Sequence, residues 1–171
     1  ARMFGRTDDA MAMYRGALAK NPNIRDANYC LAYMYYEAKQ PDKMMPLTDK
    51  LMEVDPSNGD NFLMRAYAYS LMSGAEKDAK KKTELLKMQD EFAGKEAALA
   101  TQHKLTVSRF ERKAEGGTLG GQIENFTKAA KSYTLTMHFL DASGGVVESQ
   151  TVTVADVKAG DRGTFEIKAT K

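Results

Sequence analysis

Apolar and polar residues follow two different periods along this chain, and the change lies near Gln102. From Arg2 to about Thr101, apolar residues recur every three or four positions, the spacing that places them on one face of a helix. Prolines, glycines and short polar stretches interrupt this pattern and divide it into five predicted helices. These helices are expected after Gly5, at 25–39, from Asp42 to Pro56, at 59–72 and from Glu76 to about Ala100. We expect Asp42 to cap the third helix and Ser73-Gly74 to end the fourth.

Beyond Gln102, β-branched and aromatic residues become frequent and alternate with polar ones, which predicts strands. The expected strands cover 103–113, 119–126, 131–140, 146–155 and 162–169. In the third, one face is predicted to carry Tyr133, Leu135, Met137 and Phe139, and the other Thr134, Thr136 and His138. Short strands separated by turn signals predict a small antiparallel sandwich. The fold class is therefore multidomain, α then β, with a helical domain at 1–101 and a β domain at 102–171.

Three pairs of glycines in the second half invite a phosphate-loop interpretation. The pairs are Gly116-Gly117, Gly120-Gly121 and Gly144-Gly145. None of them precedes a helix with the spacing that such a loop requires. We interpret them as turns and bulges.

A fixed spacing runs through the helical half. Asn21-Pro22 and Asp55-Pro56 lie 34 residues apart, and a similar helical run precedes each pair. A period of this length is typical of helical-hairpin repeats, which stack into extended arrays. Because such arrays present binding surfaces more often than active sites, the spacing favours a binding function.

The residues at corresponding places resemble the tetratricopeptide repeat (TPR) family. The partial first repeat supplies Gly5, Ala10, Tyr14, Ala17 and Pro22, the second Leu31, Ala32 and Tyr35, and the third Phe62, Ala66 and Tyr69. Asn28 and Arg65 differ from the family pattern. The resemblance implies a TPR-type helical hairpin array whose first repeat is incomplete and whose last helix, from Glu76, closes the stack.

The same resemblance implies a concave groove lined by the first helix of each repeat. The residues it places there are Asp26, Tyr29, Tyr33, Tyr36, Glu37, Asp60, Leu63, Tyr67 and Ser70. Tyr29, Tyr33 and Tyr36 form a stripe on one helix, and tyrosines combine an apolar body with a hydrogen-bonding tip, which suits peptide contact. The stripe could equally pack against a neighbouring repeat. Asp26, Cys30 and Asp60 are not the residues of the family's carboxylate clamp, so we do not expect chaperone-tail binding.

The β half resembles the FxLYD domain, an immunoglobulin-like (Ig-like) module of bacterial and archaeal proteins. The resemblance rests on Gly121–Asn125, Tyr133–Asp141 with Phe139-Leu140-Asp141, Gly144–Val147, and Val157–Asp161 followed by Thr164-Phe165. Leu140 stands where the family has a tyrosine before the aspartate. The resemblance implies an Ig-like β-sandwich that adheres to a partner or acts as a spacer.

Composition narrows the function classes. Of the 171 residues, 25 are Lys or Arg and 23 are Asp or Glu, so the formal net charge is only +2. We expect no nucleic-acid partner, because such binding depends on neutralised phosphates. No apolar run is long enough for a transmembrane segment. The single cysteine, Cys30, rules out an internal disulfide, and the two distant histidines suggest neither a metal site nor a catalytic pair. We expect no cofactor and no enzymatic activity.

These observations favour a non-catalytic protein–protein interaction or assembly module of a bacterial cell-envelope protein, with a protein or peptide partner in the TPR groove. The alternative is a structural subunit of a larger envelope complex or filament. A periplasmic or cell-surface location is favoured over the cytoplasm because of the β-half resemblance. The sequence begins at Ala1, where a first repeat helix should be ending, so we also expect that N-terminal sequence precedes it.

Overall fold

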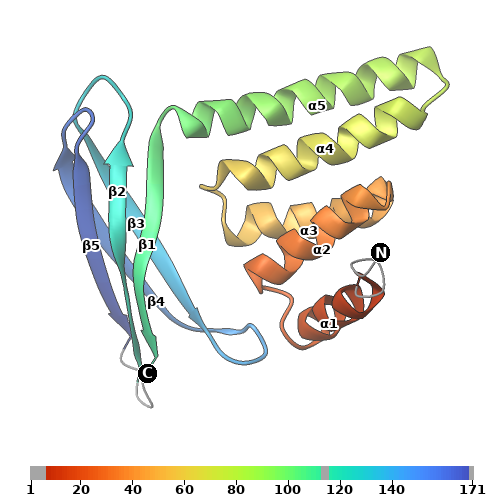
Figure 1. Ribbon diagram of the computed structural model, residues 1–171. Coiled ribbons are helices and arrows are strands. Elements are labelled where there is room, and N and C mark those ends of the chain that lie inside the picture. Colours follow the sequence, from red (N-terminus) through yellow and green to blue (C-terminus); the bar gives the residue numbers. More distant parts are fainter. Residues whose placement is uncertain (1–6, 113–115, 170–171) are drawn as a thin grey trace. The chain divides into compact units, whose positions relative to one another are not determined.

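The computed structural model describes residues 7–112 and 116–169, as five helices followed by five strands (Figure 1). This confirms the predicted order of a helical part and then an antiparallel β part. The chain divides into two compact units, Ala1–Leu99 and Ala100–Lys171. Predictions that involve Arg2, Gly5, Lys113 and the chain ends lie outside the described residues.

The helical unit contains five helices joined by short turns. They are α1 (Thr7–Lys20), α2 (Arg25–Glu37), α3 (Pro41–Val54), α4 (Gly59–Ala75) and α5 (Ala79–Ala100). Three predicted details were wrong. The last helix does not start at Glu76, which is the C-cap of α4, and α5 begins at Ala79. Helix α3 begins at Pro41, with Gln40 rather than Asp42 at the N-cap, because proline suits the first helical position. Helix α4 continues through Ser73-Gly74 to Ala75, because an interior glycine costs only about 1 kcal/mol.

Apolar side chains from four helices form one core. Its buried members are Met11, Leu31, Ala32, Tyr35, Met44, Met64 and Ala68. Helix α2 contacts α1, α3 and α4, so it is the central helix of the unit (Figure 1). The small side chains of Ala32 and Ala68 let these helices approach closely. Full burial of a methionine or leucine contributes roughly 1.5–3 kcal/mol each, which makes this core the main source of stability.

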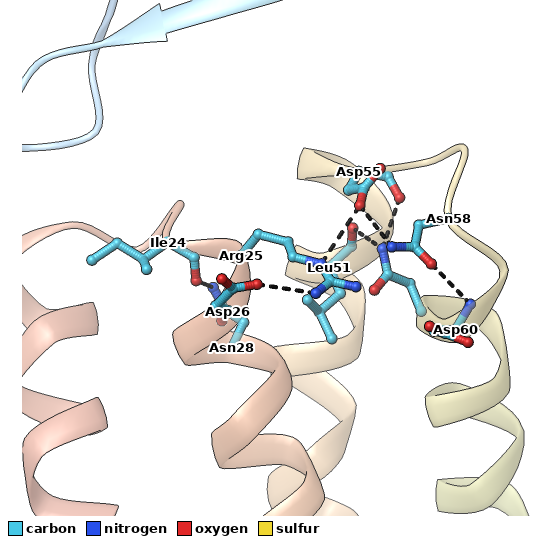
Figure 2. Close-up of polar contacts among 9 residues, drawn as sticks. Ile24, Arg25, Asp26, Asn28, Leu51, Asp55, Asn58 and Asp60 are labelled. Carbon is cyan, nitrogen blue, oxygen red and sulfur yellow. Dashed lines mark hydrogen bonds and ion pairs between the residues drawn. The ribbon is translucent and has the colours of Figure 1, made fainter. Parts of the chain in front are cut away.

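Two buried asparagines repeat the same hydrogen bonds at the start of α2 and α4. The Asn28 amide donates to the carbonyl oxygen of Pro22 at 2.8 Å, and the Asn61 amide donates to that of Asp55 at 2.7 Å. Each acceptor lies six residues before its asparagine. The Asn61 amide also donates to the Leu51 carbonyl at 3.1 Å, and Figure 2 shows Leu51 and Asp55 near the end of α3. Since Asn28 and Asn61 are 33 residues apart, the buried positions recur one residue sooner than the prolines.

Arg65 is buried in α4, at a position where the sequence differs from the TPR pattern that it resembles. Its side chain is only 4% exposed and forms an ion pair with Asp49 of α3. Burial lowers the pKa of Arg65, although the group stays charged at any physiological pH. The guanidinium also lies 5.8 Å from the ring centroid of Phe92 in α5. Phe92 stacks near Tyr69, at 5.7 Å between ring centroids, so aromatic and cationic contacts attach α5 to α4.

The β unit consists of two antiparallel sheets. Its strands are β1 (His103–Arg112), β2 (Gly117–Asn125), β3 (Lys131–Leu140), β4 (Val146–Val157) and β5 (Arg162–Ala169). One sheet has the order β1-β2-β5, and β3 pairs with β4 in the other. As predicted, the apolar face of β3 is the more buried one, while its threonines and His138 are exposed. The two sheets share a core built from Ile123, Val154, Val157 and Phe165.

Gly120 and Gly121 lie inside β2 and face an irregularity in β1. The register shifts between Val107 and Arg109, directly opposite these glycines, which fits their interpretation as part of a bulge. A Cβ on Gly121 would lie 2.2 Å from the Thr106 carbonyl oxygen and 2.9 Å from Cζ of Phe165. Only glycine therefore allows β1 and Phe165 to approach β2 this closely.

Candidate functional site

Helix α2 places three of the predicted tyrosines on one side. Tyr29, Tyr33 and Tyr36 are separated by four and three residues, so their side chains project from successive turns. Tyr29 and Tyr36 are half-buried and pack against the helical core. Tyr33 is 48% exposed. The stripe thus contributes both to packing and to an accessible surface.

Helix α4 adds a fourth tyrosine to this surface. The ring of Tyr67 stacks on that of Tyr36, with centroids 5.1 Å apart and an interplanar angle of 29°. Tyr33 lies next to Tyr36, at 6.2 Å between ring centroids, and Tyr67 is 37% exposed. We call the surface formed by Tyr29, Tyr33, Tyr36 and Tyr67 the tyrosine face.

Two carboxylates raise the pKa values of phenols in the tyrosine face. Glu37 raises the pKa of the Tyr33 phenol, first through its negative charge and then through the hydrogen bond that it accepts. Burial raises the pKa of Tyr29, and the charge of Asp60 adds to this effect. The Tyr67 phenol raises the Tyr29 pKa further. Both carboxylates are exposed, and Glu37 lies one helical turn after Tyr33.

The remaining predicted residues lie at the margins of the tyrosine face. Asp26 is exposed at the start of α2 and accepts a hydrogen bond from Arg25 at 3.0 Å. Leu63 and Ser70 lie one turn before and one turn after Tyr67 on α4, half-buried and exposed respectively. Ser70 uses its carbonyl oxygen to accept from the Ser73 hydroxyl.

One residue of the site, Arg25, did not emerge from the sequence. Its guanidinium lies over the Tyr29 ring, 5.0 Å from the centroid, and opposes the rise in the Tyr29 pKa. It forms ion pairs with Asp26 at 3.0 Å and with Asp55 at 3.5 Å, and Figure 2 shows it between these carboxylates. The pattern Arg25-Asp26 before a tyrosine was the available signal. Its meaning depended on Asp55, which belongs to another turn.

Cys30 and the two histidines make local side-chain contacts. Cys30 is hydrogen-bonded to Tyr14, and this bond raises the pKa of that phenol. His138 shares a 2.8 Å hydrogen bond with Ser149 on the exposed side of the β3–β4 sheet. The His103 ring lies 5.6 Å from that of Tyr133. Across residues 7–112 and 116–169, no three His, Cys, Asp or Glu side chains form a group that could hold a metal ion.

The β unit has a recess of about 460 Å³ at one end. Apolar side chains from β1, β3 and β4 line it, among them Phe110, Phe139 and Val147. His138 and Asp141 also border it, but the Asp141 carboxylate accepts from the backbone amides of Ser143 and Gly145. The hydrogen bond from the Ser143 hydroxyl, followed by these backbone bonds, lowers the Asp141 pKa, and together they hold the β3–β4 turn. Glu111 and Arg112 of β1 complete the polar part of the lining.

Among the helices in the described part of the chain, none combines the length and apolar character that a membrane crossing requires. Comparison with protein-family models found no match, and neither did comparisons with curated proteins and with solved structures. The TPR and FxLYD resemblances consequently rest on the residues quoted for them above.

Proposed function

We propose that this chain is a non-catalytic protein–protein interaction module that binds a protein or peptide partner on the tyrosine face. The observation that carries this proposal is the Tyr36–Tyr67 stack, which joins two helices into one partly exposed aromatic surface. Tyrosine is enriched in binding surfaces because a large rigid ring loses little conformational entropy on binding.

A TPR-type organisation of the helical unit supports this function. Helices α2 and α4 would be the inner helices of two successive repeats, and they contact each other directly. The matching bonds of Asn28 and Asn61 indicate that the two hairpins are built alike. The β unit would be an FxLYD-like, Ig-type spacer, in a protein of the bacterial periplasm or cell surface.

Site-specific photo-crosslinking tests the proposal. A photoreactive phenylalanine analogue at position 33 or 67 should form a covalent adduct with one partner protein in an extract of the source organism. The matched control carries the same analogue at Phe110, an exposed aromatic position of β1. The same adduct from position 110, or no adduct from 33 and 67, would contradict binding at the tyrosine face.

A structural subunit is the second candidate, and the edge of the three-stranded sheet favours it. Strand β1 lies at this edge and exposes Val107 and Phe110, the latter 69% accessible. An exposed strand edge with apolar side chains is a template for pairing with another chain. Size-exclusion chromatography with light scattering decides this point. Concentration-dependent oligomers that Val107→Lys disperses would support assembly, and a monomer at all concentrations would exclude it.

A further inference from the structure

Near the tyrosine face, helices α2 and α4 carry more acidic than basic side chains. The two helices contain only two basic residues, Arg25 and Arg65. Arg65 is buried and paired with Asp49 of α3, so it does not neutralise the carboxylates beside the tyrosines. Glu37 and Asp60 are both exposed, and Glu37 lies one helical turn after Tyr33 on α2. Their charges raise the pKa values of Tyr33 and Tyr29.

Arg25 shows how this surface accommodates a cation. Its guanidinium lies over the Tyr29 ring at 5.0 Å, and the Asp26 and Asp55 carboxylates bind it from outside. A guanidinium on a tyrosine ring next to a carboxylate gains both cation–π and charge-assisted hydrogen-bond energy. Tyr33 with Glu37 provides the same pair of groups, with the ring exposed.

We infer that the partner presents an extended segment with at least two arginine or lysine residues. This inference rests on the proposed function and names the chemistry of the partner. One basic side chain lies beside the exposed carboxylate of Asp60, at the end of the tyrosine face where Arg25 already covers the Tyr29 ring. The other lies on Tyr33 next to Glu37. Tyr29 and Glu37 mark these two ends on α2 and are eight residues apart, about 12 Å at 1.5 Å per helical residue. An extended chain covers that length in about four residues, so the basic positions are separated by three or four.

The experiment starts from a phage-displayed library of random dodecapeptides panned on the immobilised full chain. Selected peptides are resynthesised with fluorescein, and their dissociation constants are measured by fluorescence anisotropy. The expected peptides carry two Arg or Lys residues three or four positions apart. Their affinity should fall at least tenfold for the variant Glu37→Gln/Asp60→Asn and decline as salt is added, since screening weakens exposed charge pairs.

The matched control is Glu84→Gln/Asp90→Asn, which removes two exposed carboxylates from α5 and should leave the affinity unchanged. Circular dichroism of all variants confirms that the helices are intact. Peptides without basic enrichment, or equal binding to Glu37→Gln/Asp60→Asn, would overturn the inference.

The outcomes separate this inference from the function on which it rests. Binding that Tyr33→Ala/Tyr67→Ala abolishes, but that the carboxylate variant leaves intact, refutes the basic partner and keeps the binding surface. Binding that neither variant affects, or a library that yields no binder, refutes both. Self-association that the tyrosine variant abolishes would identify a second copy of the chain as the occupant and would also refute the basic partner.

Discussion

The phenol ring of Tyr36 in α2 stacks on that of Tyr67 in α4, with 5.1 Å between the ring centroids. The two residues are far apart in sequence, and each lies on a helix that also contributes to the core. This stack makes the tyrosine face part of the packing between α2 and α4. A partner bound as proposed would meet two rings that the packing already holds in place, which would lower the entropic cost of binding.

A double-mutant cycle measures this stack. We expect Tyr36→Leu and Tyr67→Leu to be coupled by about 0.5–1.5 kcal/mol, the usual value for an aromatic pair. The free energies of unfolding come from urea titrations followed by helix circular dichroism. Additive effects of the two substitutions would show that the rings do not stabilise one another.

Asn61 should be far more important for stability than its neighbour Asn58. Asn61→Ala removes the amide that donates to both the Leu51 and Asp55 carbonyls, each of which keeps only one backbone donor, and it empties the space of a fully buried side chain. We therefore expect a loss of about 2–3 kcal/mol. Asn58 accepts from the Asp60 amide as an N-cap, and Asn58→Ala should cost about 1 kcal/mol. Urea unfolding of both variants is the measurement, and equal losses would contradict the assigned roles.

Substitution by alanine should destabilise the protein at only one of two adjacent glycines of β2. Gly121→Ala places a Cβ against the Thr106 carbonyl, a backbone atom that cannot move aside, so we expect a loss of about 3 kcal/mol or more. At Gly120 the nearest atom would be 3.4 Å away, and Gly120→Ala should stay within about 1 kcal/mol of the wild type. Hydrogen exchange of β2 and β5 amides measures both. Similar protection in the two variants would contradict this packing.

Acid should destabilise the β unit through His103. Burial lowers the His103 pKa below its ordinary value of 6.5, and the charge of Lys131 lowers it further. The unfolded chain therefore binds a proton at a higher pH than the folded one. Stability is unaffected well above pH 6.5 and falls as the pH drops through that value toward the folded pKa. Amide exchange in β2 and β3 should show a smaller loss between neutral and mildly acidic pH for His103→Gln. An unchanged pH dependence in His103→Gln would show that His103 does not cause the acid sensitivity.

The periodicity of apolar residues predicted the helices and strands well, because it depends only on residues close together in the sequence. All five strands and the helical order appear where alternation and breakers placed them. The start of α3 was missed because proline at position 41 suits the first helical position. The end of α4 was missed because one interior glycine is too weak a signal to end a helix. The Asn28 and Asn61 bonds and the buried Arg65 were missed for another reason. Their partners, such as Asp49 and the Leu51 carbonyl, are reached only after the chain has folded.

The candidate site, too, was predictable only where it depends on neighbouring residues. The spacing of Tyr29, Tyr33 and Tyr36 predicted one stripe, since it depends on a single helix. Whether that stripe is buried or exposed depends on α4, and the structure places Tyr67 beside it while leaving Tyr33 half accessible. The role of Arg25 could not be predicted because it depends on the ion pair with Asp55, which belongs to the turn after α3.

The most direct test of the central claim is the affinity for the partner recovered by crosslinking, measured by titration calorimetry. We expect Tyr33→Ala/Tyr67→Ala to weaken binding by about thirtyfold or more, the effect of losing central aromatic anchors. Phe110→Ala, which truncates an aromatic that is more exposed than either tyrosine, should leave the dissociation constant unchanged. An unchanged affinity in the tyrosine variant, or an equal loss in Phe110→Ala, would show that the partner does not bind the tyrosine face.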